Sequence, residues 1–189
     1  MFTISNFKTA QLDNPHFVKP LRLNYVQNGT HKSWEAVKSF DSVSVLLYHQ
    51  DRDVFVLVKQ FRAAVYMNDS SHTYTYELCA GIIDKDVSLK QIVKEEIDEE
   101  CGYEVCIDHI HKITSFFTNV GVSGAKQHLF FATVDETMHR HSGGGIETEE
   151  IFVEYLHVND AQKFMYDETK AKTPGLLFAF EWFFKNHIN

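Results

Sequence analysis

The chain has 189 residues, of which 44% are hydrophobic, and its 26 acidic and 18 basic side chains give a formal net charge of −8. This is the size of one ordinary globular domain with a small appendage. A strongly acidic protein is poorly suited to bind the phosphates of nucleic acids or an anionic membrane surface, so we expect neither as a partner.

The excess negative charge lies in two short stretches. Residues 81–103 hold seven acidic and three basic side chains, and residues 145–157 hold four acidic side chains with no lysine or arginine. The rest of the chain carries 15 side chains of each sign. The charge pattern therefore indicates two local groups of carboxylates that would face each other across bound cations.

The cysteines and the apolar runs favour a soluble, cytoplasmic protein. Cys79, Cys101 and Cys106 show neither metal-ligand spacing nor the dense, even usage of a disulfide scaffold, so we expect reduced thiols. The first residues lack a basic start followed by an apolar core, which argues against a secretory signal. No apolar run approaches the roughly 18 residues that a membrane helix needs.

The predicted elements begin with a β-hairpin at residues 20–40, whose strands alternate around a two-residue turn at Asn28 and Gly29. A two-stranded hairpin is marginal alone, so we expect it to pack on the main body or on another subunit. Strands at residues 42–49 and 54–60 follow. Their near-continuous apolarity indicates burial on both faces.

Helices and strands alternate through the rest of the chain. We expect a strand at 74–79, a helix at 88–101 with Ser88 as its N-cap, strands at 111–118, 127–134 and 151–157, and helices at 160–166 and 174–186. The glycine clusters at 121–124 and 143–145 are predicted loops. Sheet elements with helices on either side predict a mixed α+β fold or an α/β/α sandwich.

The helix at 88–101 carries the most informative pattern. On a helical wheel, Glu96, Glu99 and Glu100 fall on the face that Ile92 and Val93 define as buried. The same wheel turns Glu95 and Asp98 outward. A solvated charged face does not place its carboxylates in this way.

Inward carboxylates repel one another and are costly to desolvate unless protons or cations compensate. Magnesium prefers oxygen ligands and is commonly held by one or two carboxylates together with substrate phosphates. The alternative is an acidic helix end that frays into water. Acidic groups at a helix C-terminus oppose the macrodipole, however, so stability alone gives no reason to collect them there.

The segment that contains this helix resembles the Nudix box. Gly81-IIDKDVSLKQIVKE-Glu96-IDEECGY matches the pattern of glycine, five residues, Glu, seven residues, Arg-Glu, an aliphatic residue, any residue, Glu-Glu, any residue and glycine, with no gap. Two positions depart, because Val87 stands where the family has its first Glu and Glu95 where it has Arg. The resemblance implies a Nudix-type α/β/α sandwich with a mixed sheet.

The resemblance extends over most of the chain. The segments LRLNYVQNG, KSWE, DSVSVLLY, LVKQFRAAVY, ELCAG and EECGY, and a glycine run followed by acidic residues, are similar to the uridine diphosphate glucose pyrophosphatases, a branch close to the ADP-ribose pyrophosphatases. It implies hydrolysis of a nucleotide sugar at its diphosphate, with Mg²⁺ as the cofactor and Mn²⁺ as the alternative ion.

The resemblance also assigns the metal ligands. The backbone oxygen of Ala80, the residue before the box glycine, and the carboxylates of Glu96, Glu100 and Glu99 stand at the family's ligand positions. Glu99 is also expected to take part in catalysis. A later acidic residue usually completes such a site as ligand or as the base that orients water.

The run after the glycine loop is the acidic cluster placed for that last role. Glu149 is the first choice and Glu147 the second, because the register of residues 147–150 is uncertain by a residue or two. The alternative is a solvated entrance to the next strand.

Five residues are expected to contact the substrate, namely Arg62, Trp34, Glu35, Glu77 and Gly81 at the start of the box. Arg62 follows a buried strand and could hold phosphate oxygens in bidentate fashion rather than form a surface ion pair. Trp34 and Glu35 correspond to residues that bind the base in related ADP-ribose enzymes, although a lone Trp is as often part of a core. Glu77 either pairs with Arg62 or contacts the substrate. The eleven histidines are scattered and are expected at the surface.

The resemblance further implies a homodimer in which residues 1–40 take part in dimerisation and base binding, while residues 41–189 form the hydrolase domain. Two alternatives stay open. The substrate could be ADP-ribose or an ADP-sugar, or the departures at Val87 and Glu95 could leave a nucleotide-binding protein without hydrolysis.

Overall fold

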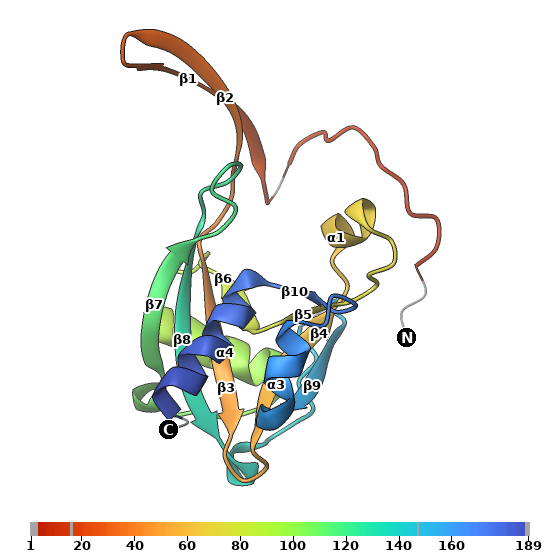
Figure 1. Cartoon of the computed structure of the whole chain (residues 1–189), viewed down its shortest axis with the longest axis vertical. Helices are drawn as coiled ribbons and strands as arrows, with labels where there is room; N and C mark the ends of the chain where they lie inside the picture. Colours follow the sequence, from red (N-terminus) through yellow and green to blue (C-terminus); the bar gives the residue numbers. More distant parts are fainter. Residues whose placement is uncertain (1–3, 16, 147, 188–189) are drawn as a thin grey trace.

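A computed structural model describes residues 4–15, 17–146 and 148–187. Its centre is an eight-stranded mixed sheet in the order β10-β5-β4-β3-β8-β7, with β6 also paired to β3 and β9 to β4 (Figure 1). The strands are β3 (Ser42–His49), β4 (Val54–Gln60), β5 (Thr75–Glu77), β6 (Cys79–Ile82), β7 (His111–Phe117), β8 (Lys126–Val134), β9 (Ile151–His157) and β10 (Ala171–Lys172). The pairs β3–β8 and β5–β10 are parallel, and the other pairs are antiparallel.

Helices cover both faces of this sheet. The α-helices are α1 (Ala63–Asn68), α2 (Leu89–Glu96), α3 (Val158–Met165) and α4 (Pro174–His187); Ile97–Cys101 forms a π-helical turn (η1), and two 3₁₀ turns span Ile107–His109 (η2) and Glu136–Met138 (η3). One core lies between the sheet and α2–η1, and a second lies between the sheet and α3–α4. The predicted α/β/α sandwich is therefore confirmed.

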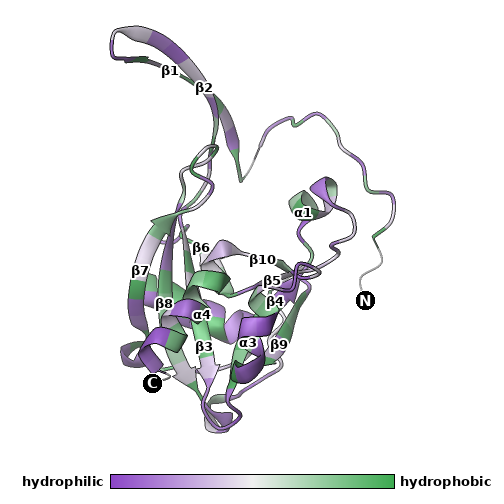
Figure 2. Ribbon diagram, in the orientation of Figure 1, coloured by the Kyte–Doolittle hydropathy of each residue, from purple (hydrophilic) through white to green (hydrophobic). Residues whose placement is uncertain are grey.

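The central strands owe their position to their apolar sequence. Strands β3 and β4 contribute residues to both cores, as their near-continuous apolarity predicts. Figure 2 shows hydrophobic residues along the central strands of the main sheet and a mixture of hydrophobic and hydrophilic residues along α3 and α4. No helix in the described part of the chain is long and apolar enough to cross a membrane.

The hairpin of β1 (Lys19–Gln27) and β2 (Thr30–Lys38) projects away from the sandwich (Figure 1). Asn28 and Gly29 adopt positive φ angles of 52° and 77°, which confirms the predicted two-residue turn. Two hydrogen bonds join β2 to the loop between β7 and β8: the Trp34 indole N–H donates to the Gly121 carbonyl (2.8 Å), and the Val37 N–H donates to the Val122 carbonyl (2.8 Å).

Several sequence predictions need correction. The single strand expected at 74–79 is two strands, because the chain leaves β4 after β5 and pairs with β3 through β6. The helix expected to run to residue 101 is α-helical only to Glu96 and continues as the π-helical turn. His49 is fully buried rather than at the surface, with its ring edge-on to Tyr103.

Some elements were not predicted at all, namely α1, β10 and the two 3₁₀ turns. All are short, and α1 has no buried residue, so no apolar pattern marks it. Cys79, Cys101 and Cys106 are free thiols, as expected.

Candidate functional site

The site begins where β6 meets the following helix. A Cβ atom added to Gly81 would lie 1.8 Å from Oε1 of Glu96, so the Glu96 carboxylate rests directly on the Gly81 backbone. Any larger residue at position 81 would displace this carboxylate. Ser88 caps α2 by accepting the Gln91 N–H on its side chain (3.2 Å), which confirms the predicted start of the helix.

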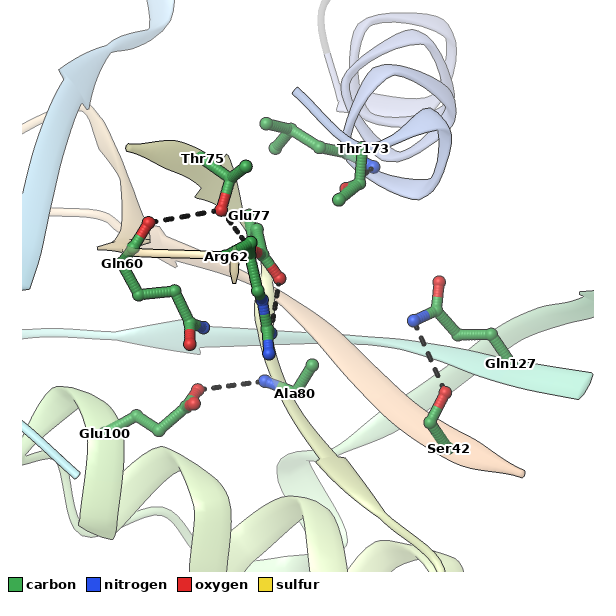
Figure 3. Close-up of polar contacts among 10 residues, drawn as sticks. Ser42, Gln60, Arg62, Thr75, Glu77, Ala80, Glu100, Gln127 and Thr173 are labelled. Carbon is green, nitrogen blue, oxygen red and sulfur yellow. Dashed lines mark hydrogen bonds and ion pairs between the residues drawn. The ribbon is translucent and has the colours of Figure 1, made fainter. Parts of the chain in front are cut away.

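Glu100 is the most deeply buried carboxylate of the group, with 5% of its surface exposed. Its Oε2 accepts the backbone N–H of Ala80 at 2.9 Å (Figure 3). Burial raises the pKa of Glu100 to about 8, and the charges of Glu96 and Glu149 add to the rise, while the Ala80 hydrogen bond opposes it. Glu100 therefore lies in a place where a carboxylate is costly without a cation.

Glu96 is also partly buried, and its pKa is raised less than that of Glu100. Burial raises its pKa to about 7, and the neighbouring charges of Glu99 and Glu149 raise it further. Glu99 is half-buried beside it. Asp98 points outward and pairs with His141 at 3.1 Å, as the helical wheel predicts. The wheel thus separates the inward from the outward carboxylates correctly, although the last turn is not α-helical.

The glycine loop ties the second acidic stretch to the end of this helix. Gly143, Gly144 and Gly145 all have positive φ, and the Gly144 and Gly145 amides donate to the carbonyls of Glu100 and Glu99, each at 3.0 Å. These two bonds satisfy carbonyls that a helix end leaves without partners, and they accompany the wider π-helical turn. The loop is therefore fixed on the backbone of the expected ligands.

Glu149 follows this loop and faces the box carboxylates. Its side chain is exposed, and its Oε2 accepts the Ile146 N–H at 3.0 Å. Its charge acts on Glu96, Glu100 and Arg62. Glu149, in the second acidic stretch, thus lies near the carboxylates of the first stretch, as expected from the charge pattern. Glu147, the second choice for this role, lies outside the described residues.

Arg62 and Glu77 form a bidentate ion pair beside these carboxylates (Figure 3). The Nε and Nη2 groups of Arg62 donate to the two oxygens of Glu77 at 2.8 and 2.7 Å, and the Thr75 hydroxyl donates to the same carboxylate. Glu77 raises the pKa of Arg62 through this pair, with smaller contributions from the charges of Glu100 and Glu149. Of the two expectations for Glu77, pairing with Arg62 is therefore present.

The arginine keeps part of its surface free. Its side chain is 49% exposed, against 10% for Glu77. The buried Glu77 fixes the Nε and Nη2 side of the guanidinium, and the rest of the group is partly exposed. The structure brings Arg62, Glu77, Glu96, Glu100 and Glu149 into one region around β6.

Trp34 and Glu35 are not part of this group. Both lie on the projecting hairpin, where Trp34 is 56% exposed and Glu35 pairs with Arg22 at 3.0 Å. Figure 1 places the hairpin well away from α2 within one chain. A single chain therefore separates the expected base-binding residues from the expected metal ligands.

The donor set suits a hard divalent cation, because it consists of carboxylates whose raised pKa values reflect uncompensated burial and mutual repulsion. The described residues contain no group of three carboxylate, imidazole or thiol side chains already arranged around one point. Glu100, for example, uses one carboxylate oxygen to accept the Ala80 N–H. The carboxylate oxygens are suitable ligands for a hard cation, and the side chains would have to move closer together to hold one.

Two residues of this region were missed by the sequence analysis. Lys85 donates to Glu95 at 2.9 Å, and the Gln91 side-chain amide donates to the other oxygen of Glu95, also at 2.9 Å. The spacing of Gln91 and Glu95, four residues apart on a helix, is a signal that could have found the second contact. Lys85 lies in a loop, so no periodicity indicates its partner.

No family model matches the chain. Among curated proteins, the chain is 35% identical to the uridine diphosphate glucose pyrophosphatase NUDT14 of Bos taurus, over 90% of this chain and 89% of that protein. The corresponding protein of Mus musculus is 32% identical, over 91% and 90% of the two chains. The GDP-mannose pyrophosphatase of Pectobacterium atrosepticum is 33% identical, over 67% and 64%. Together with the box geometry, these relatives show that the chain belongs to the Nudix hydrolase family.

Proposed function

We propose that the chain hydrolyses the diphosphate of a nucleotide sugar, UDP-glucose or a close relative, to a nucleoside monophosphate and a sugar 1-phosphate. The observation that carries this proposal is the similarity over nine-tenths of the chain to proteins named uridine diphosphate glucose pyrophosphatase. The GDP-mannose pyrophosphatases match a shorter part of the chain, which supports our expectation that a uridine nucleotide is the preferred substrate.

The metal in this proposal is Mg²⁺, with Mn²⁺ as the alternative. Glu96, Glu99, Glu100 and the carbonyl of Ala80 would hold it. When bound, such cations neutralise the charge of the diphosphate and lower the pKa of a bound water. The support for these ligands is the burial of Glu96 and Glu100, which raises the pKa of both carboxyls and favours a cation beside them.

Arg62 would bind the diphosphate through the edge of the guanidinium that Glu77 leaves free. The buried carboxylate of Glu77 prevents rotation of the arginine, so a phosphate meets a preformed donor edge. Glu149 would accept a proton from the attacking water, since it faces the ligand carboxylates from a loop that the helix end holds in place. Glu147 remains the second choice for this role.

The hairpin would supply the base-binding residues to a second copy of the chain. One face of the hairpin is apolar and exposed. Leu23 and Trp34 are cross-strand neighbours on this face, and Leu21 and Tyr25 lie on the same side of β1 as Leu23. An exposed apolar face on a marginal two-stranded element favours a partner that covers it. A homodimer would do so and would bring Trp34 and Glu35 of one subunit toward the carboxylates of the other.

A substrate panel tests the reaction. UDP-glucose, GDP-mannose and ADP-ribose are each incubated with the protein and Mg²⁺, and the released nucleoside monophosphate and sugar phosphate are identified. We expect UMP and glucose 1-phosphate as the preferred products, and no release when the metal is chelated. Preferential release of AMP would replace the substrate with ADP-ribose. A protein that binds these compounds but cleaves none would be a nucleotide-binding protein that has lost hydrolysis.

Sedimentation tests the assembly. We expect the wild-type protein to sediment as a dimer and Leu23→Asp to sediment as a monomer, because the new charge would lie within the apolar face. A monomeric wild-type protein would contradict the proposed role of the hairpin.

A further inference from the structure

Glu95 occupies the box position where the family has arginine, and the structure gives it a specific partner. Lys85, from the loop between β6 and α2, donates its ammonium to Oε2 of Glu95 at 2.9 Å. The Gln91 side chain donates to Oε1 of the same carboxylate, also at 2.9 Å. Both oxygens of Glu95 are thus engaged, and the carboxylate is held in one orientation from two sides.

Lys85 lies within electrostatic reach of the expected metal ligands. Its charge lowers the pKa of Glu96 against the larger effect of burial, and the charge of Glu99 helps to raise the pKa of Lys85. Yet its described hydrogen bond goes to Glu95, on the side of the helix away from the buried face. The Lys85 ammonium therefore lies near the carboxylates of Glu96 and Glu99, but its described hydrogen bond is to Glu95.

This arrangement matters because an ammonium and a divalent cation compete for the same oxygens. Lysine carries a compact charge on a flexible four-carbon stem, so an unrestrained Lys85 can move toward nearby carboxylates. The Lys85 side chain is 52% exposed, so about half of its surface meets solvent. The hydrogen bond to Glu95, itself fixed by Gln91, is the restraint that the structure provides.

We propose that Glu95 is a positioning residue that holds Lys85 away from Glu96 and Glu99, and so keeps these carboxylates available for the metal. The inference rests on the proposed function, in that it takes the box glutamates as the cation site. In this proposal, Glu95 at the position of the family's arginine tunes metal affinity. The replacement does not by itself imply a loss of activity.

The test is direct binding of Mn²⁺ to the full chain without substrate, by isothermal titration calorimetry at low salt. Glu95→Gln should weaken Mn²⁺ binding by roughly two- to fivefold, as expected for one unit charge brought closer to a divalent cation in a well-solvated site. Lys85→Met should tighten binding by a similar factor, because it removes the competing charge. The double variant should bind like Lys85→Met.

Two comparisons separate this mechanism from a purely structural one. If the Lys85–Glu95 pair only held the loop in place, both single variants would weaken binding, and that result would overturn the proposal. The effect of Glu95→Gln should also shrink at high salt, since screening weakens interactions between exposed charges. Glu104→Gln is the matched control, because Glu104 forms an ion pair of the same length with Arg140. It should bind Mn²⁺ like the wild type.

The outcome also distinguishes this inference from the proposed function. Wild-type binding with no difference between the variants would overturn the role of Glu95 and leave the metal site standing. A wild-type protein that binds no Mn²⁺ would overturn the metal site and this proposal together. Thermal unfolding of each variant verifies that all of them are folded.

Discussion

The hairpin β1–β2 and the segment β6–α2–η1 place their side chains in opposite environments. Each residue of β1 is exposed, including the apolar ones, whereas the box segment buries Glu100 and half-buries Glu96. The hairpin has unsatisfied apolar surface and the box has uncompensated buried charge. In the proposed function, a second subunit would cover the apolar face of the hairpin, and cations would compensate the buried carboxylates of the box.

This difference indicates a division of roles. The carboxylates lie on elements packed against a core. The Ala80 N–H donates to the Glu100 carboxylate, and the Gly144 and Gly145 amides donate to the backbone carbonyls of Glu100 and Glu99. Such support suits groups that must hold a fixed geometry during a reaction. The hairpin is joined to the sandwich by few contacts, which suits an element that binds another subunit and a substrate base.

The largest expected effect comes from the buried carboxylates. Glu96→Gln and Glu100→Gln should each reduce turnover of UDP-glucose at least about a thousandfold, because metal stabilisation of a transition state is worth several kcal/mol. Circular dichroism should show an unchanged fold. The matched control is Asp98→Asn, on the outward side of the same turn, which should stay close to the wild-type rate. Unchanged turnover in Glu100→Gln would refute the site.

The contact of Gly81 with Glu96 predicts the next effect. Gly81→Ala should lower kcat about a hundredfold, since a displacement of about 1 Å at a catalytic group can have this result. Steady-state kinetics with saturating Mg²⁺ measures it. Gly121→Ala is the control, because a Cβ there has open space. Equal kinetics for Gly81→Ala and wild type would show that activity does not depend on the contact between the Glu96 carboxylate and the Gly81 backbone.

The hairpin should show a different kinetic signature. Trp34→Ala should raise KM for UDP-glucose roughly tenfold and leave kcat within about twofold, since stacking on an aromatic ring contributes about 1–3 kcal/mol per base. Trp34→Phe retains a stacking surface and should recover most of the affinity. A fall in kcat with unchanged KM would place Trp34 outside base binding.

The smallest effect concerns stability without metal. Because burial raises the pKa of Glu100 to about 8 and of Glu96 to about 7, the folded protein holds more protons than the unfolded chain between about pH 4.5 and pH 8. Stability is then greatest below the unfolded pKa and declines as the pH rises through the folded values.

Thermal unfolding in a chelator measures this decline. The melting temperature of the wild type should fall from pH 5 to pH 8, and each kcal/mol of lost stability lowers it by about 2–4 °C in a domain of this size. Glu100→Gln should fall less steeply. Equal slopes in the two proteins would contradict the burial cost assigned to Glu100.

The sequence predicted the sandwich and the inward side of Glu96 and Glu100 because both depend on local periodicity. The apolar strands β3 and β4, the helix face of Ile92 and Val93, and the separation of Glu96 and Glu100 from Asp98 follow from spacing alone. The division at Leu78 between β5 and β6 could not be predicted, because it depends on which neighbouring strand each half pairs with.

The site was less predictable where it depends on contacts between distant residues. The pairing of Arg62 with Glu77 was one of two expectations that the sequence left open, and its bidentate geometry comes only from the fold. The capping of the helix by the glycine loop joins segments far apart in the chain, so spacing does not reveal it. The burial of His49 was missed for the same reason, since its surroundings come from Tyr103 and Glu136.

Direct titration of Mn²⁺ into the wild type and Glu100→Gln tests the central claim most directly, because that claim is that the buried box carboxylates form the cation site. We expect saturable binding by the wild type that is lost or weakened at least about tenfold in Glu100→Gln, with binding by Asp98→Asn unchanged. Equal Mn²⁺ affinity in the wild type and Glu100→Gln would contradict the account.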